Sequence, residues 1–139
     1  MNREIKFRAW DKTLNQMNYK VLVGNTDYND ENYTCNAIWV EDSKRWVNAD
    51  GNCIDLMQFT GKKDKEGKEI YEGDVVVLRE ANRKYVVKFN NAAFKLFHAD
   101  PKINDMEWGN LSRVDELLWE INVIGDIYTN PELLDEPQH

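Results

Sequence analysis

The chain has 139 residues, of which 42% are hydrophobic and 12% aromatic, and this content excludes an intrinsically disordered or low-complexity protein. No apolar run approaches the roughly 20 residues of a membrane-spanning helix, and charges lie where a secretion signal would have its apolar core, so we expect a cytoplasmic protein. The net charge is −7, and residues 71–139 carry 7 basic against 13 acidic side chains, an excess that should repel nucleic-acid phosphates.

The N-terminal region is predicted to form a β-hairpin. Ile5, Phe7 and Ala9 alternate with residues of other character, which is the period of a half-buried strand. A polar turn at 11–16 then leads into a second alternating run at 17–23.

A second hairpin is predicted farther along the chain. Residues 24–34 are polar and rich in turn-forming residues, which predicts a long exposed loop. The short apolar runs at 37–40 and 45–48 flank a polar turn, so they should pair as antiparallel strands. Trp39 and Trp46 would then meet across this hairpin.

A change of character after residue 60 indicates a boundary between two subdomains. The apolar run at 54–59 is compatible with a helix or a strand, whereas residues 60–69 are charged and contain glycine. We therefore predict a β-rich N-terminal subdomain of residues 1–60 and a second subdomain of residues 61–139.

The connection 61–74 should be held by its two apolar side chains, Ile70 and Tyr71, which we predict to be buried. Gly67 and Gly73 are predicted to supply positive φ angles at the turns on either side.

The C-terminal half is predicted to contain a meander of three antiparallel strands. An aliphatic strand follows the turn at Glu72, Gly73 and Asp74, and further alternating runs lie at 85–90 and 93–98.

The rest of this half combines helical and strand signals. Leu111, Val114, Leu117 and Leu118 have the spacing of an amphipathic helix at about 111–119. A strand at 121–128 is followed by a helix start, with Asn130 as the N-cap and Pro131 at the first helical position.

Nucleophilic catalysis is disfavoured by the small number of candidate groups. Histidine occurs only at His98 and His139, serine only at Ser43 and Ser112, and no GxSxG sequence is present. His98 is more typical of a packing residue at the rim of a strand. We predict no catalytic residue and no cofactor, because phosphate-binding glycine motifs are also absent from the sequence.

A metal site is also disfavoured. Cys35 and Cys53 are isolated, without zinc-ligand spacing, and are expected to be reduced and buried. A magnesium site built from Asp64, Asp74 and Asp126 stays a weaker alternative, because each lies in or beside a turn where aspartate forms local hydrogen bonds.

Cations beside aromatic or other cationic residues define a candidate interaction surface, which comprises Arg8, Trp10, Trp46, Lys62 and Lys63. The aromatic rings could stack on bases, although strand residues of this kind more often face the core. The lysines are interleaved with acidic residues, which favours a solvated loop over a phosphate site.

Three segments carry a resemblance to a known family: REIKFRAWDK at 3–12, MQFTGKKDKEGKEIYEGDVV at 57–76 and VIGDIYTNPELL at 123–134. They resemble the YopX family, small proteins carried by phages and prophages. In two places the chain departs from the family pattern, which commonly has Asn where Asp126 stands and an apolar residue where Lys62 stands.

The resemblance implies a mainly β fold of the β-rich α+β type. The expected fold has an N-terminal β-hairpin region, a C-terminal SH3-like barrel and one or two short helices. It also implies a homo-oligomer in the bacterial host cytosol and supplies no catalytic residues.

We expect a non-enzymatic protein-binding or accessory module of unknown molecular activity, whose partner is itself or a host or phage protein. The first alternative is a β-barrel protein that binds single-stranded nucleic acid. The second is a metal-dependent phosphoester hydrolase that uses clustered carboxylates.

Overall fold

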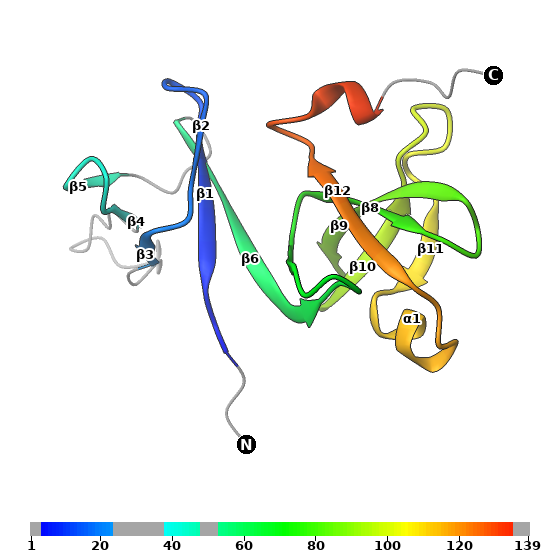
Figure 1. Cartoon of the computed structure of the whole chain (residues 1–139). Coiled ribbons are helices and arrows are strands. Elements are labelled where there is room, and N and C mark those ends of the chain that lie inside the picture. The colour runs from blue at the N-terminus through cyan, green and yellow to red at the C-terminus, as the bar shows by residue number, and fades with distance from the viewer. Residues whose placement is uncertain (1–3, 24–37, 48–52, 135–139) are drawn as a thin grey trace. The chain divides into compact units, whose positions relative to one another are not determined.

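The computed structural model describes residues 4–23, 38–47 and 53–134 (Figure 1). These residues form a mainly β protein with short helical segments, as expected. Two compact units are present. The N-terminal unit comprises Ile5–Gln58, and the C-terminal unit comprises Phe59–His139 together with Met1–Glu4.

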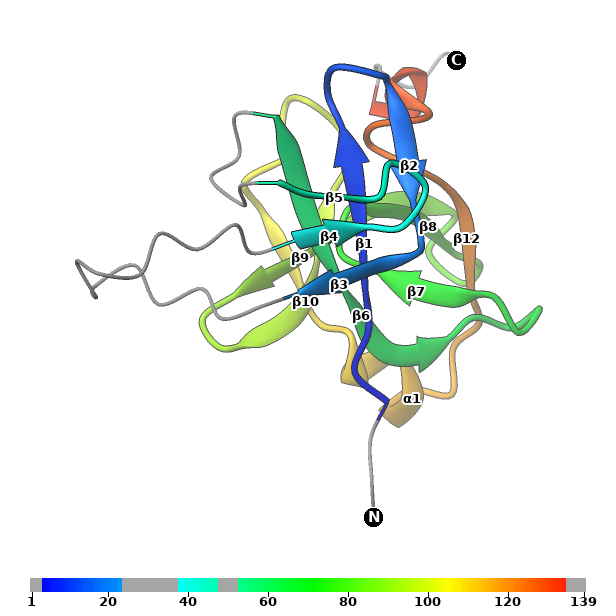
Figure 2. The same cartoon turned by 90° about the vertical axis from the view of Figure 1, so that its left-hand side faces the viewer.

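Two small antiparallel sheets build the N-terminal unit. β1 lies between β2 and the first half of β6, and β4 lies between β3 and β5. Figures 1 and 2 show the three-stranded sheet crossing one face of β1 and β6. The strands are β1 (Phe7–Asp11), β2 (Gln16–Asn18), β3 (Val21–Val23), β4 (Ile38–Val40), β5 (Arg45–Val47) and β6 (Ile54–Lys63).

The core of this unit is made by the facing sides of the two sheets. It consists of Ala9, Ile38, Val40, Val47 and Ile54, each at most 8% exposed. Because strand side chains alternate between faces, the residues between these positions in β3, β4 and β5 point away from the core.

The first hairpin is confirmed, but the single second strand predicted over 17–23 is wrong. Those residues form β2, which pairs with β1, and β3, which pairs with β4. Apolar residues alternate with other residues without a break through the bend at Tyr19 and Lys20. This is because β2 and β3 each belong to a sheet with one buried and one exposed face. Periodicity therefore gave no sign of the change of sheet.

The second hairpin is confirmed. Trp39 and Trp46 are register partners, and their ring centroids lie 5.6 Å apart at an interplanar angle of 60°.

β6 settles the ambiguous run at 54–59 as a strand. It continues through Thr60–Lys63, which the sequence had indicated as part of a charged loop. This part pairs with β7 (Glu69–Tyr71) through a shifted register. Half-exposed strands accept polar side chains on their open face, so composition alone misplaced the loop.

The C-terminal unit contains a five-stranded antiparallel sheet of order β11-β10-β9-β8-β12. The predicted meander is confirmed, since consecutive strands β8, β9 and β10 are neighbours. The strands are β8 (Asp74–Leu78), β9 (Arg83–Asn90), β10 (Ala93–His98), β11 (Glu107–Asn110) and β12 (Ile121–Asp126).

Apolar side chains cover both faces of this sheet. The larger cluster contains Ile70, Leu78, Tyr85, Leu96 and Val114. A smaller cluster on the other face is formed by buried residues of β8 and β9 with Ala99, and the 3-10 helix η1 (Pro131–Leu134) packs against it.

Helix α1 is shorter than predicted and spans Ser112–Glu116. Leu111 and Val114 are buried as the spacing indicated, but Leu117 and Leu118 are 39% and 89% exposed. The helix ends because Leu118 takes a left-handed conformation with a φ of 58°, so the later leucines leave the buried side.

Helix η1 begins at Pro131 as expected, but Asn130 does not act there through its side chain. Its Oδ1 accepts a hydrogen bond from the Asp126 N–H at 3.2 Å, whereas its backbone carbonyl accepts the Leu133 N–H. β11 was not among the strands predicted from the sequence.

The predicted anchor and turns of the connection are confirmed. Ile70 is 0% and Tyr71 4% exposed. Gly67 and Gly73 have φ angles of 85° and 84°. The Gly73 N–H also bonds to the Val87 carbonyl at 2.8 Å, which ties this turn to β9.

The predicted loop at 24–34 and Cys35 lie outside the described residues. Cys53 is exposed rather than buried, because it precedes β6 at a bend. Within the described ranges, no helix has the length and apolar character needed to cross a membrane.

Replacing Ile70 with Ala should lower the free energy of unfolding by about 2–5 kcal/mol, since it leaves a cavity in the core. Lys63 is exposed, and Lys63→Ala should change the free energy of unfolding by less than about 0.5 kcal/mol. Urea titrations of both variants check this. Equal, small effects would show that the connection is a loose tether.

Candidate binding surfaces

Asp64 organises the turn between β6 and β7 and attaches it to β12. Asp64 is only 8% exposed. Oδ1 accepts the backbone N–H groups of Glu66 and Lys68 at 2.9 and 2.8 Å, and Oδ2 accepts that of Val123 at 2.9 Å. The adjacent Lys65 N–H bonds to the Ile121 carbonyl at 3.0 Å. The carboxylate therefore joins segments that are distant in sequence.

The other two aspartates considered as metal ligands have similar local bonds. Asp74 Oδ2 accepts the Tyr71 N–H at 2.8 Å. Asp126 Oδ1 accepts the N–H groups of Tyr128 and Thr129 at 2.9 and 2.7 Å. No group of three His, Cys, Asp or Glu side chains suited to a metal ion occurs within the described part of the chain.

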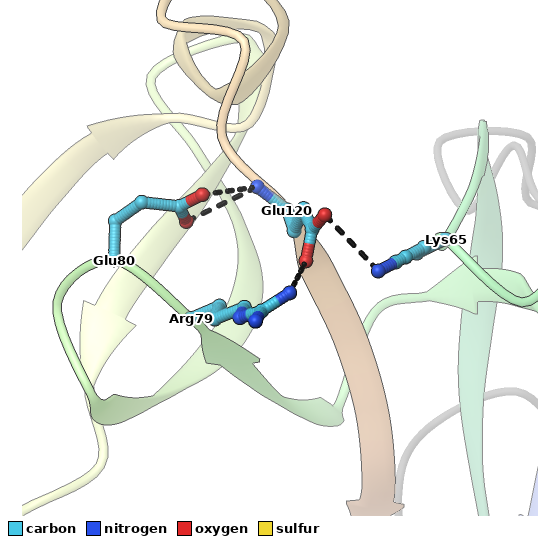
Figure 3. Close-up of polar contacts among 4 residues, drawn as sticks. All are labelled: Lys65, Arg79, Glu80 and Glu120. Atoms are coloured by element: carbon cyan, nitrogen blue, oxygen red, sulfur yellow. Dashed lines mark hydrogen bonds and ion pairs between the residues drawn. The ribbon is translucent and has the colours of Figure 1, made fainter.

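A charged network lies around Glu120, just before β12 (Figure 3). Its carboxylate accepts from Arg79 Nη1 at 2.8 Å and pairs with Lys65 Nζ at 3.0 Å. Glu80 accepts the backbone N–H of Glu120 at 3.1 and 3.2 Å. The hydrogen bond from Arg79, followed by that from Lys65, lowers the pKa of Glu120.

An apolar row runs across the outer face of the three-stranded sheet of the N-terminal unit. Leu22 is the register partner of Trp39, and Trp39 is the partner of Trp46. Leu22 is 65% and Trp46 49% exposed. We call Leu22, Trp39 and Trp46 the tryptophan face. The opposite side of these strands is buried, since Ile38, Val40 and Val47 belong to the core.

Charges flank the tryptophan face. The indole Nε1 of Trp39 donates to Glu41 Oε2 at 2.8 Å, and Lys44 pairs with Glu41. These two partners, Lys44 first, lower the pKa of Glu41. Arg45 is the register partner of the core residue Val40 and lies on the opposite side of the sheet, where its Nη2 is 3.8 Å from Asp11 Oδ2.

Of the predicted surface residues, Trp46 lies on this face, whereas Arg8 does not. Arg8 is only 2% exposed, with Nε donating to the Met57 sulfur at 3.4 Å. Its guanidinium lies 5.9 Å from the Tyr19 ring centroid. Trp10, also on β1, is half-buried. The prediction thus combined a buried cation with an exposed ring.

The predicted residues Lys62 and Lys63 lie in the C-terminal unit, where Lys62 borders a cleft and Lys63 is exposed. Lys62 forms an ion pair with Asp115 of α1. The cleft has a volume of about 280 Å³. Its lining includes Thr60, Lys62, Phe94, Asn110, Leu111 and Asp115. We call this the α1 cleft.

The lining of the α1 cleft combines the apolar side chains of Phe94 and Leu111 with polar and charged ones. Phe94 packs edge-on against Phe89, with ring centroids 5.1 Å apart, and Leu111 is buried. Thr60 uses its hydroxyl within the fold, because it donates to the Ile70 carbonyl at 2.7 Å. Sequence reasoning missed this cleft, because Thr60, Phe94 and Leu111 come from segments that are distant in the sequence.

His98 is a packing residue, as the sequence favoured. Its ring lies 5.0 Å from that of Tyr85, and burial raises the pKa of Tyr85. A second, smaller cavity of about 170 Å³ beside His98 is lined by apolar residues such as Ala99 and Ile127.

Comparison with known proteins adds an independent result. A family model described as YopX protein matches residues 6–135. The crystal structure of protein EF1440 from Enterococcus faecalis is 26% identical, with a TM-score of 0.61, over 96% of this chain and 99% of that chain. The structure of protein yopX from Bacillus subtilis is 23% identical, with a TM-score of 0.55, over 95% and 97%. A search of curated proteins finds no significant match.

The fold and these matches define a small, mainly β protein whose architecture is shared over nearly its whole length with two solved bacterial structures. The chain belongs to the YopX family. The resemblance seen in the sequence is thereby confirmed.

Asp64→Ala should lower the free energy of unfolding by about 1–3 kcal/mol or more, because backbone donors lose a charged acceptor in a largely buried place. Glu66→Ala, at an exposed position of the same turn, is the control. Chemical denaturation measures both. Equal effects would contradict the joining role of Asp64.

Glu120→Gln tests the network through pH. A carboxyl group whose pKa is lowered on folding stabilises the fold above its ordinary pKa of 4.5, and this contribution disappears as the pH falls through the folded-state value. Wild type should therefore be more stable than the variant near neutral pH, and the difference should vanish in acid. Glu116→Gln, the same loss of charge on α1, controls for net charge. A pH-independent difference would contradict this interpretation.

Proposed function

We propose that this chain is a phage- or prophage-encoded accessory protein without catalytic activity, which acts in the bacterial cytosol by binding another protein. The observation that carries the proposal is the tryptophan face. Large apolar side chains at the centre of an exposed face are typical of protein interfaces, in which tryptophan is enriched among the residues that dominate affinity.

The chemistry of the face favours a protein with an apolar surface as the partner. The two rings meet edge to face at 60°, and Leu22 extends the row without a ring on which a base could stack. Glu41 lies beside Trp39 at hydrogen-bonding distance, and its charge opposes a phosphate. These features support protein contact over the stacking of single-stranded nucleic acid.

Two finer points belong to this proposal. The protein works as a homo-oligomer, and its C-terminal unit is an SH3-like barrel. The five-stranded antiparallel sheet, with β7 and the second half of β6 in the same unit, supports the second point.

Trp46→Ala should abolish partner capture while leaving the fold intact, because half of the ring already contacts solvent. We would compare crosslinked captures from phage-infected host cells by wild type, Trp46→Ala and Phe89→Ala. Phe89 is 54% exposed in the C-terminal unit and is the matched control.

A protein captured by wild type and by Phe89→Ala, but lost with Trp46→Ala, supports the proposal once purified and shown to bind directly. Identical captures by all three would contradict it. Salt-dependent binding of single-stranded DNA or RNA that is lost with Trp46→Ala would favour the nucleic-acid alternative instead.

A further inference from the structure

A mainly apolar cavity of about 170 Å³ lies beside the smaller core cluster of the C-terminal unit. Four of its lining residues belong to that cluster or pack against it: Val86, Ala99, Ile127 and Leu134. Lys88 also lines it, whereas none of the described residues in the lining is an aspartate or a glutamate. We call this the Lys88 cavity. The charge of its described lining is therefore positive, although the chain has a net charge of −7.

The ammonium group of Lys88 is held on the face of the sheet that carries the cavity. Side chains alternate along β9, so Lys88 shares a face with Val86 of the smaller cluster. Its Nζ lies 5.0 Å from the centroid of the Phe97 ring. This cation–π contact orients the ammonium and leaves its N–H groups without a lone-pair acceptor. Within the described part of the chain, the Lys88 ammonium has no hydrogen-bond acceptor and no ion-pair partner.

Lys88 also faces a second cation across the sheet. Its register partner on β10 is Lys95, and like charges directly opposite each other on antiparallel strands are destabilising. The charge of Lys95 is balanced by Glu107 on β11, because Nζ and Oε1 lie 3.0 Å apart. That carboxylate is used by Lys95, so the repulsion would be relieved further by an anion bound beside Lys88.

The neighbouring histidine does not change this charge. His98 borders the cavity, but its ring packs on Tyr85, with centroids 5.0 Å apart. Tyr85 belongs to the larger cluster, on the other face of the sheet. One lysine therefore provides the positive charge, and an apolar hollow lies next to it.

We propose that the Lys88 cavity binds a small carboxylate with a compact apolar body. The Lys88 ammonium pairs with the carboxylate, and the apolar body fills the hollow. Apolar cavities of about 150 Å³ accommodate a benzene molecule, so a cavity of about 170 Å³ has room for one ring. A carboxylate is favoured over a phosphate dianion, because a single lysine would leave a second negative charge unbalanced beside an apolar wall.

This binding activity goes beyond the protein contact proposed above and does not depend on the tryptophan face. Benzoate, benzamide and acetate are suitable probes. Benzoate has the ring and the charge, benzamide the ring alone and acetate the charge alone. The full chain would be titrated with each at constant ionic strength, and its amide signals would be followed by nuclear magnetic resonance. Benzoate should bind with a dissociation constant on the order of a millimolar and more tightly than the other two.

Lys88→Met tests the charge, because methionine keeps an apolar stem but has no ammonium. It should weaken benzoate binding about fivefold or more and leave benzamide binding unchanged. Lys88 is exposed, so the variant should fold. Arg83→Met is the matched control. It removes the same charge from an exposed position on the opposite face of β9 and should leave both affinities unchanged.

Ala99→Leu tests the hollow by filling it from a buried position of its wall. It should abolish the binding of benzoate and of benzamide alike, and denaturant titration checks its fold. A peptide C-terminus offers the same carboxylate and ring as a free acid, so N-acetyl-phenylalanine is titrated beside benzoate. Tighter binding of benzoate identifies a free acid as the ligand, and tighter binding of N-acetyl-phenylalanine identifies a peptide end.

Benzoate binding that requires both the ring and Lys88 supports the proposal. Equal affinities for benzoate and benzamide, or equal benzoate affinities of wild type and Lys88→Met, would overturn the carboxylate site. If the wild type binds neither benzoate nor benzamide, the cavity is not a ligand site. Each of these results leaves the protein contact through the tryptophan face unaffected.

Discussion

The C-terminal unit depends on one largely buried carboxylate. Asp64 accepts N–H groups from its own turn and, with its second oxygen, from Val123 on β12. Since β12 is the edge strand of the five-stranded sheet and pairs with β8, this one side chain fixes the sheet edge relative to the turn between β6 and β7. Gly67 gives that turn its positive φ. With the turn held in this place, the Lys65 N–H can bond to the Ile121 carbonyl and the Gly67 N–H to the Asp64 carbonyl.

The segments that carry the family resemblance are explained largely by such turns. Asp64, Asp74 and Asp126 each satisfy backbone donors close to them in sequence. A neutral Asn at position 126 could accept the same hydrogen bonds through its carbonyl oxygen, so the carboxylate of this chain is not required for that role. The tryptophan face lies outside these segments. The three aspartates of these segments therefore serve the fold.

Local regularities in the sequence predicted the meander, both hairpins, the strand that forms β12 and the buried pair Ile70 and Tyr71. What alternation could not show was where a strand changes partners, so residues 17–23 looked like one strand. Charge and polarity were also poor guides to structure and exposure. Thr60–Lys63 is polar but forms a strand, and Arg8 is cationic but is buried beside Met57. Of the residues predicted as an interaction surface, only Trp46 and Lys62 lie on the two candidate surfaces. The sequence did not predict the cleft, because its lining comes from segments that are distant in the chain.

The distribution of the tryptophans has a practical consequence. Trp39 and Trp46 form one close pair in the N-terminal unit, and Trp108 and Trp119 form another in the C-terminal unit, with centroids 5.6 and 5.7 Å apart. Neighbouring indoles couple their electronic transitions, so each pair should give its own near-ultraviolet circular dichroism signal. The protein thus contains an intrinsic optical reporter in each half, and replacing one ring of either pair would allow the melting of the two halves to be recorded separately, without any attached dye.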